Sequence, residues 1–187
     1  RRIHDSFIDA LSRRAGRLRM GDTRHAATTL GPLISRAQQQ RVLAYVEAGT
    51  AEGAQCIQPP GEVPTQGFFV PPTIFAGARN DMRIAREEIF GPVATVIPFD
   101  DAEEAVAMAN DSAYSLAAGL WTRDVCVAHA LAHRLRAGTV WVNTFGPTSS
   151  QLPWGGLGGD SGVGRDLGRS ALDAYTEPRV VWLQLSP

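Results

Sequence analysis

Between residues 93 and 142 the chain alternates between segments typical of β-strands and segments typical of helices. The strand-like segments are 93–99, 116–121 and 139–142, and the helical segments between them are 100–110 and 122–137. Strands joined by helices pair in parallel, because each helix returns the chain so that the next strand runs in the same direction. The pattern therefore predicts an α/β fold with a largely parallel sheet and flanking helices.

The N-terminal part of the chain holds two more helix patterns and one interrupted strand pattern. Apolar residues at helical spacing mark residues 4–19. Ser35 and Gln38 form a capping-box pattern for a second helix that runs to about Gly49. Two prolines interrupt the β-prone stretch 68–75, and proline cannot donate a ladder hydrogen bond, so this stretch predicts an edge strand or a break.

The chain changes character after Asn143. Residues 146–164 are crowded with glycine, proline and serine, which predicts a long irregular loop of the kind that is usually functional. A short helix is expected at 168–175. The last segment, 179–185, is apolar and β-prone, and an exposed terminal strand is ready to pair with another chain.

Charge and composition argue against several classes of partner and chemistry. The net charge is −1, and all 18 basic residues are arginine. The sequence has no stripe of basic residues with interleaved aromatics, the pattern that would predict nucleic-acid binding. Because lysine is absent, the chain itself offers no Schiff-base or phosphate-loop lysine. No apolar run is long enough for a signal peptide or a membrane span. Two cysteines without metal or disulfide spacing, Cys56 and Cys126, favour a reducing, cytoplasmic setting.

Two patterns that suggest chemistry have simpler interpretations. His129 and His133 have the spacing that lets two imidazoles share a metal, but Ala130 stands where the HExxH motif has glutamate. Their apolar neighbours favour packing or surface histidines. The glycines between 155 and 168 fit no GxGxxG register, and they favour a loop that needs unusual backbone angles or a close approach to a substrate.

Glu87 and Glu88 are adjacent, so their side chains diverge and cannot form a facing acid–base pair. They lead directly into Ile89-Phe90-Gly91-Pro92 and then into a predicted strand. A carboxylate and an aromatic ring at a strand entrance can hold a polyhydroxylated ring and a flat heterocycle. Two adjacent glutamates alone favour solvated charges, and by physical reasoning their setting only suggests a binding role.

Residues 81–93, Asp-Met-Arg-Ile-Ala-Arg-Glu-Glu-Ile-Phe-Gly-Pro-Val, strongly resemble the signature segment of NAD(P)-dependent aldehyde dehydrogenases. The resemblance covers nearly the whole chain. Further segments match the family in the family's own order: 31–35, 67–70, 72–75, 109–111, 116–124, 137–143, 153–156, 161–165 and 175–177. So many ordered matches make coincidence implausible.

The resemblance implies roles for five residues. Glu88 matches the residue that holds the nicotinamide ribose hydroxyls, and Phe90 matches the aromatic that packs near the nicotinamide of NAD or NADP. Asn143, Phe145 and Trp154 match the walls of the tunnel through which the aldehyde substrate reaches the site. No metal site is implied.

The resemblance also divides the chain. Residues 1–175 correspond to a portion of the catalytic domain, and 176–187 correspond to an arm that extends the sheet of a neighbouring subunit. The implied protein is therefore a homo-oligomer assembled through its C-terminal strand.

The family's catalytic groups are expected outside this chain. The resemblance places the nucleophilic cysteine just upstream of Arg1, and the general-base glutamate and the cofactor domain further upstream. Neither Cys56 nor Cys126 matches such a position. A thiolate must attack the carbonyl before hydride can leave. No catalytic residue is therefore assigned within the chain, and we expect it to be inactive alone.

Three departures from the family pattern lie near the glycine-rich loop. Glycine at 158 or 159 stands where many members have lysine, one extra residue separates 155–156 from 161–162, and Ser115 replaces the usual glycine. All three bear on the tunnel, and so on the aldehyde that it admits.

Two other functions remain open beside oxidation of an aldehyde to an acid. One is a non-catalytic remnant that serves as a structural or oligomerisation module. The other is an acylating semialdehyde dehydrogenase that uses coenzyme A or phosphate instead of water. The choice between NAD and NADP is made in the cofactor domain.

Overall fold

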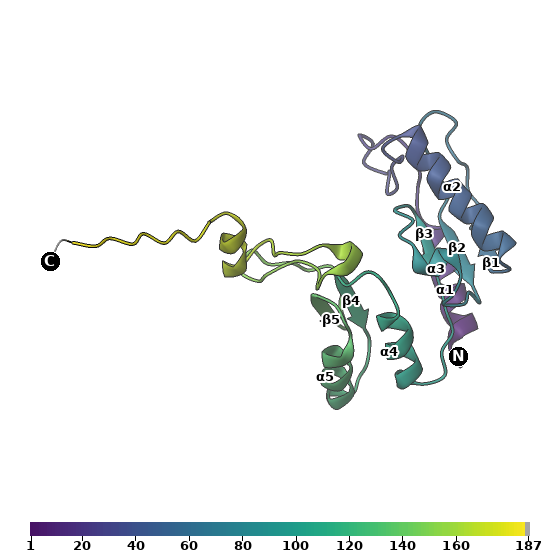
Figure 1. Ribbon diagram of the computed structural model, residues 1–187. Helices are drawn as coiled ribbons and strands as arrows, with labels where there is room; N and C mark the ends of the chain where they lie inside the picture. Colours follow the sequence, from purple (N-terminus) through teal and green to yellow (C-terminus); the bar gives the residue numbers. More distant parts are fainter. Residues whose placement is uncertain (186–187) are drawn as a thin grey trace. The chain divides into compact units, whose positions relative to one another are not determined.

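The computed structural model describes residues 1–185, and the chain divides into two compact units, Arg1–Asp101 and the part from Ala102 onward (Figure 1). The last two residues of the predicted arm, 186–187, lie outside the described part. The first unit contains α1 (His4–Ala15), α2 (Arg36–Ala51), β1 (Gln55–Ile57), β2 (Thr73–Ala76), α3 (Arg83–Arg86) and β3 (Val93–Thr95). The second contains α4 (Ala102–Asn110), β4 (Ala117–Leu120), α5 (Val125–Arg134), β5 (Thr139–Val142) and two 3₁₀ turns, Gly159–Ser161 and Arg169–Ala174.

The sheet of the first unit has the order β1-β2-β3 and is mixed. β2 pairs in parallel with β3, through Ile74 and Ala94, but antiparallel with β1, through Cys56 and Phe75. The expectation of a largely parallel sheet took no account of β1, because its three residues show no strand pattern in the sequence. The α/β content is as predicted, in small sheets rather than one continuous sheet.

β2 is buried on both faces, and this arrangement organises the first unit. Successive side chains of a strand point to opposite faces. Phe75 joins the core cluster formed with α2 and α3, whereas Ile74 and Ala76 pack with Ile8 of α1. The prolines before β2 produce the break that the sequence allowed, and the strand that follows them is central rather than at an edge.

The second unit is built on a parallel pair, β4 and β5, joined through α5. Its register runs from Ala117 opposite Thr139 to Leu120 opposite Val142. Gly138, just before β5, lies directly against the glycine-rich loop: a methyl group there would stand 1.8 Å from the Gly155 carbonyl oxygen. Only glycine permits that approach, so this position anchors the loop to the sheet.

Several boundaries differ from the sequence-based expectation for physical reasons. α5 begins after Asp124, whose carboxylate accepts from the backbone N–H groups of Cys126 and Val127, rather than at Thr122. It ends at Arg134, before Gly138 is reached. The expected helix at 168–175 is a 3₁₀ helix, Arg169–Ala174, that follows a glycine with positive φ.

The segment 179–185 forms no strand within the described part of the chain. It runs extended from the rest of its unit (Figure 1), and its apolar side chains are exposed, Trp182 to 91%. The strand expected there therefore has no partner among residues 1–185. None of the helices in these residues combines the length and apolar character that a bilayer-spanning segment needs.

Candidate functional site

The loop 87–91 joins α3 to β3 and carries both predicted cofactor-binding residues. Glu88 and Phe90 are exposed, the Phe90 ring to 75%, whereas Ile89 between them is buried in the α2 cluster. Alternate side chains of the loop thus point inward and outward. The structure places Glu88 and Phe90 together, on one exposed loop before the N-terminal end of β3.

Phe90 has a backbone conformation that is rare for its residue type. Its φ is 56°, in the left-handed region that side chains with a Cβ disfavour. Such a conformation costs of the order of 1–3 kcal/mol and persists only when its surroundings hold it. Two carbonyls, those of Ile89 and Phe90, accept hydrogen bonds from Gln38 Nε2 at 3.2 and 3.1 Å. These contacts hold the strained turn against α2.

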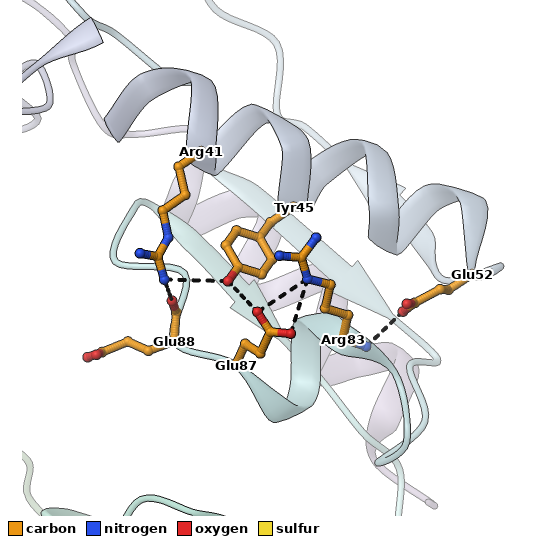
Figure 2. Close-up of polar contacts among 6 residues, drawn as sticks. All are labelled: Arg41, Tyr45, Glu52, Arg83, Glu87 and Glu88. Carbon is orange, nitrogen blue, oxygen red and sulfur yellow. Dashed lines mark hydrogen bonds and ion pairs between the residues drawn. The ribbon is translucent and has the colours of Figure 1, made fainter. Parts of the chain in front are cut away.

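The Glu87 side chain turns inward, toward α2 (Figure 2). Tyr45 Oη donates to Glu87 Oε2 at 2.6 Å, and Arg83 Nε lies 3.2 Å from both carboxylate oxygens. The Tyr45 hydrogen bond, and then the Arg83 guanidinium, hold the pKa of the Glu87 carboxyl below its ordinary value. The Glu87 carboxylate is therefore held as an anion by Tyr45 of α2 and Arg83 of α3.

The Glu88 side chain extends away from that cluster, while its backbone carbonyl accepts from Arg41 Nη2 at 3.2 Å (Figure 2). A carboxylate accepts hydrogen bonds with both oxygens, which suits the vicinal hydroxyls of a ribose. The nearby exposed ring of Phe90 offers a flat apolar surface. The loop thus presents an acceptor for hydroxyl groups beside a flat apolar surface.

Asn143 and Phe145, the first two predicted tunnel residues, follow β5 in the second unit. Asn143 also has a positive φ, 57°, and its amide spans the Thr122 backbone: Oδ1 accepts from Thr122 N and Nδ2 donates to Thr122 O, both at 2.9 Å. The amide of Asn143 thereby ties the end of β5 to the end of β4. Asn143 and Thr122 line an open hollow with Trp121 and Arg123.

Trp141 connects the two predicted aromatic walls of the tunnel. Its ring centroid lies 4.7 Å from that of Phe145 and 5.7 Å from that of Trp154, so both rings pack on it. Trp141 Nε1 also donates to the Pro147 carbonyl at 2.9 Å, which fixes the start of the loop. In the sequence alone, Trp141 is recognisable only as part of the predicted strand 139–142. The signal was the alternation in β5, which places Trp141 on one face and Val140 and Val142 on the other.

Ser115 forms hydrogen bonds to the glycine-rich loop, where the other departures from the family pattern lie. It is 5% exposed, its hydroxyl donates to the Gly158 carbonyl at 2.8 Å, and it accepts from Leu157 N at 3.0 Å. Its own backbone N–H donates to Ser161 Oγ at 2.8 Å. A glycine at 115 would lack the hydroxyl that makes two of these bonds. The serine therefore pins the segment 157–161.

The remaining candidates take no part in these arrangements. His129 and His133 both line a hollow along α5, which Asn143 also borders. Within residues 1–185, no three His, Cys, Asp or Glu side chains gather closely enough to hold a metal ion. Cys56 packs against the core cluster from β1, and Cys126 is exposed in the first turn of α5.

Comparison with known proteins gives matches over nearly the whole chain. The aldehyde dehydrogenase family profile matches residues 1–181. A betaine aldehyde dehydrogenase of Bacillus subtilis (strain 168) is 45% identical over 190 residues, covering 99% of this chain and 38% of that protein. The mitochondrial aldehyde dehydrogenase of Leishmania tarentolae is 42% identical over 179 residues, covering 96% of this chain and 36% of its own length.

Solved structures show the same similarity. The NAD⁺ complex of an aldehyde dehydrogenase from Bacillus cereus matches with a TM-score of 0.92 and 43% identity, over 100% of this chain and 38% of that one. A betaine aldehyde dehydrogenase from Staphylococcus aureus in complex with NAD⁺ gives 0.87 and 36%, over 98% and 39%. The chain thus spans less than two-fifths of the length of each of these four proteins.

Proposed function

This chain belongs to the aldehyde dehydrogenase family, and from that premise we propose that the whole protein is an NAD(P)-dependent enzyme that oxidises an aldehyde to a carboxylic acid. The chain contributes the C-terminal portion of its catalytic domain, residues 1–175. The observation that carries this proposal is the exposed loop 87–91, which presents a carboxylate and an aromatic ring while its backbone carbonyls are hydrogen-bonded to side chains of α2.

Within that enzyme Glu88 and Phe90 form part of the nicotinamide site. The cofactor, when bound, supplies the hydride acceptor. Glu88 accepts hydrogen bonds from the ribose hydroxyls, and the Phe90 ring packs near the nicotinamide. Both residues stand on a loop whose strained turn is already held by Gln38, so little freedom is lost when a ligand binds.

Asn143, Phe145 and Trp154 form walls of the aldehyde tunnel. The support is the shared aromatic contact on Trp141, which holds Phe145 and Trp154 in fixed positions. Aromatic side chains of this kind offer an apolar surface to the body of an aldehyde. Cys56 packs on the core, and Cys126 is exposed in the first turn of α5. The proposal therefore takes the nucleophilic thiol, like the general base, from another part of the protein.

The assignment of Glu88 is tested on the full-length protein by NADH formation and NADH binding. Replacing Glu88 by glutamine removes a charged acceptor, which weakens cofactor binding by roughly ten-fold or more. Glu62→Gln, in the exposed loop before β2, is the matched control and leaves binding unchanged. Unaltered cofactor binding in Glu88→Gln contradicts the assignment.

The same assay separates the alternatives. Aldehyde oxidation in water, with no added acceptor, supports the proposal. NADH formation only in the presence of coenzyme A or phosphate supports the acylating alternative. A full-length protein that assembles but oxidises no aldehyde supports the structural module.

A further inference from the structure

One stripe of α2 faces the loop 87–91. Arg41, Val42 and Tyr45 follow Gln38 by three, four and seven positions, a spacing that places side chains on one side of a helix. Val42 and Tyr45 are buried, Tyr45 to 2% exposure, while Gln38 and Arg41 lie nearer the rim. The stripe is thus apolar beneath and polar at its edge, where the loop crosses it.

Three polar side chains of the stripe each hold a different part of the loop. Tyr45 donates to the Glu87 carboxylate and Arg41 donates to the Glu88 carbonyl (Figure 2). Gln38 donates to the carbonyls of the two residues that follow Glu88. Four consecutive loop residues are therefore bound, in order, by one helix.

Val42 completes the fit at the end of the loop. A methyl group at position 91 would approach Val42 Cγ2 to 2.7 Å and Cγ1 to 2.9 Å, so only glycine lets the backbone lie this close to α2. The close approach brings the loop carbonyls within reach of the α2 side chains. Steric fit and hydrogen bonds therefore act on the same segment.

These contacts constrain the conformation of the loop 87–91. Buried or constrained backbone carbonyls need a partner, and here the partners are side chains of α2. Adjacent residues direct their side chains apart, so Glu87, once bound by Tyr45, leaves Glu88 to point away from the helix (Figure 2). Arg83 reinforces this arrangement, because its guanidinium lies 4.5 Å from the Tyr45 ring centroid and its backbone N–H donates to Glu52 Oε2.

We propose that Gln38, Arg41 and Tyr45 are positioning residues: through the carbonyls and carboxylate of residues 87–90 they set the left-handed turn at Phe90 and the outward direction of Glu88. This inference rests on the proposed function for its consequence, that cofactor binding depends on α2. Its structural content, that α2 holds the turn, stands independently. None of the three residues acts on a reacting atom in this scheme.

Three consecutive glutamines provide a matched set of variants. Gln38 holds the loop, Gln39 Nε2 donates to the Phe69 carbonyl at 2.8 Å in a different loop, and Gln40 is exposed on another face of the helix. Gln38→Ala, Gln39→Ala and Gln40→Ala therefore remove the same side chain from the same helix. They differ only in what that side chain holds.

Tyr45→Phe provides the second test. It deletes the hydroxyl that binds Glu87 and keeps the buried ring that packs beneath Arg83. Far-UV circular dichroism checks that each variant folds. Should Gln38→Ala fail that check, Tyr45→Phe and Gln38→Glu, which keeps the shape and removes the donors, replace it.

The first measurement is the φ angle of Phe90, taken from three-bond NMR couplings on the 187-residue chain. We expect Gln38→Ala to move φ from its positive value toward the ordinary negative range, or to average it, while Gln39→Ala and Gln40→Ala leave it at the wild-type value. An unchanged Phe90 in both Gln38→Ala and Tyr45→Phe overturns the inference, whatever the protein's function.

The second measurement is the dissociation constant of NADH for the full-length protein. Loss of the Gln38 bonds is expected to raise it by about three- to ten-fold, with the Gln39 and Gln40 variants within two-fold of wild type. If Phe90 moves in Gln38→Ala but neither Gln38→Ala nor Glu88→Gln alters NADH binding, the positioning contact stands and the proposed cofactor role fails. If Glu88→Gln weakens binding and Gln38→Ala does not, the positioning consequence is wrong and the cofactor role stands.

Discussion

Phe75 stands on the central strand of the first unit with its ring fully buried. It meets α2 at Gly49, where an added methyl group would approach Phe75 Cζ to 2.8 Å, and Ile84 of α3 crowds the same position. Side chains packed this closely have little room to collapse into a vacancy. Single residues of this kind therefore determine how firmly α2, and with it the loop 87–91, is held.

Replacing Phe75 by alanine is expected to destabilise the protein by about 3–5 kcal/mol, because the lost ring leaves a cavity between β2 and α2. The free energy of unfolding is measured by urea titration with far-UV circular dichroism. Phe7→Ala, at a half-exposed phenylalanine of α1, is the control and costs much less. Equal losses for the two variants contradict the burial assigned to Phe75.

The contact between Glu87 and α2 is expected to weaken in acid. The pKa of Glu87 lies below its ordinary value of 4.5 because of Tyr45, Arg83 and, more weakly, Arg41. The ionised carboxylate therefore contributes its full stabilisation above the unfolded-state pKa and loses it as pH falls through the lowered folded-state pKa. Urea midpoints measured from neutral pH downward should separate wild type from Glu87→Gln near neutrality and converge in acid. A constant difference across that range contradicts the prediction.

At the scale of elements, side-chain caps mark where α2 and α5 begin. Ser35 Oγ accepts from the backbone N–H of Gln38, as the capping-box pattern requires, and the side-chain Nε2 of Gln38 donates to the carbonyls of the loop 87–91. In α5 the capping residue is Asp124, two residues beyond the predicted start. Each cap involves residues that are neighbours in the sequence, whereas the side chain of Gln38 contacts Phe90, which lies 52 positions away.

Asp124→Ala is expected to destabilise α5 by about 0.5–2 kcal/mol, because two backbone N–H groups in its first turn lose their acceptor. Tryptophan fluorescence follows the change, since all four tryptophans lie beyond residue 120. Asp173→Ala, an exposed aspartate of the last 3₁₀ helix, serves as the control. No difference between the two variants would mean that Asp124 does not cap the helix.

At the scale of the whole molecule, the chain has an exposed apolar segment that suits contact with another protein chain. Exposed apolar residues are concentrated in the segment 179–185, where Val180, Trp182 and Leu185 are almost fully accessible. An exposed apolar run of this kind marks a contact surface. We propose that residues 176–187 form the oligomerisation arm.

Deleting residues 179–187 is expected to lower the association state of the full-length protein in analytical ultracentrifugation. The extended segment has no partner strand among residues 1–185, which leaves its backbone open to pairing with a neighbouring subunit. Val180→Asp with Trp182→Ser tests the same surface without truncation. An unchanged sedimentation profile in both variants rules out the arm.

The 187-residue chain alone is expected to oxidise no aldehyde with NAD⁺ or NADP⁺. Covalent catalysis and proximity contribute many orders of magnitude, and Glu88 and its neighbours replace neither. NADH formation is measured with several aldehydes at high protein concentration, and Cys56→Ala and Cys126→Ala exclude slow thiol reactions. Turnover above the blank that survives both substitutions refutes the prediction.

The sequence by itself determined the features that depend on neighbours along the chain. The family, most helices and strands, and the exposed loop with Glu88 and Phe90 all follow from local patterns, because caps, periodicity and motifs involve residues a few positions apart. The short strand β1, the short helix α3 and the 3₁₀ character of the last helix have no such pattern, and all three were missed.

Only the tertiary structure shows which distant residues contact the candidate site residues and the glycine-rich loop. Gln38 reaches Phe90 across 52 positions, and Ser115 reaches Gly158 across 43. Trp141 serves as the common support of Phe145 and Trp154 because β5 and the loop after it fold back on each other. Contacts of this kind depend on packing between distant segments, where shape, burial and hydrogen-bond partners are settled together, and no local pattern encodes them.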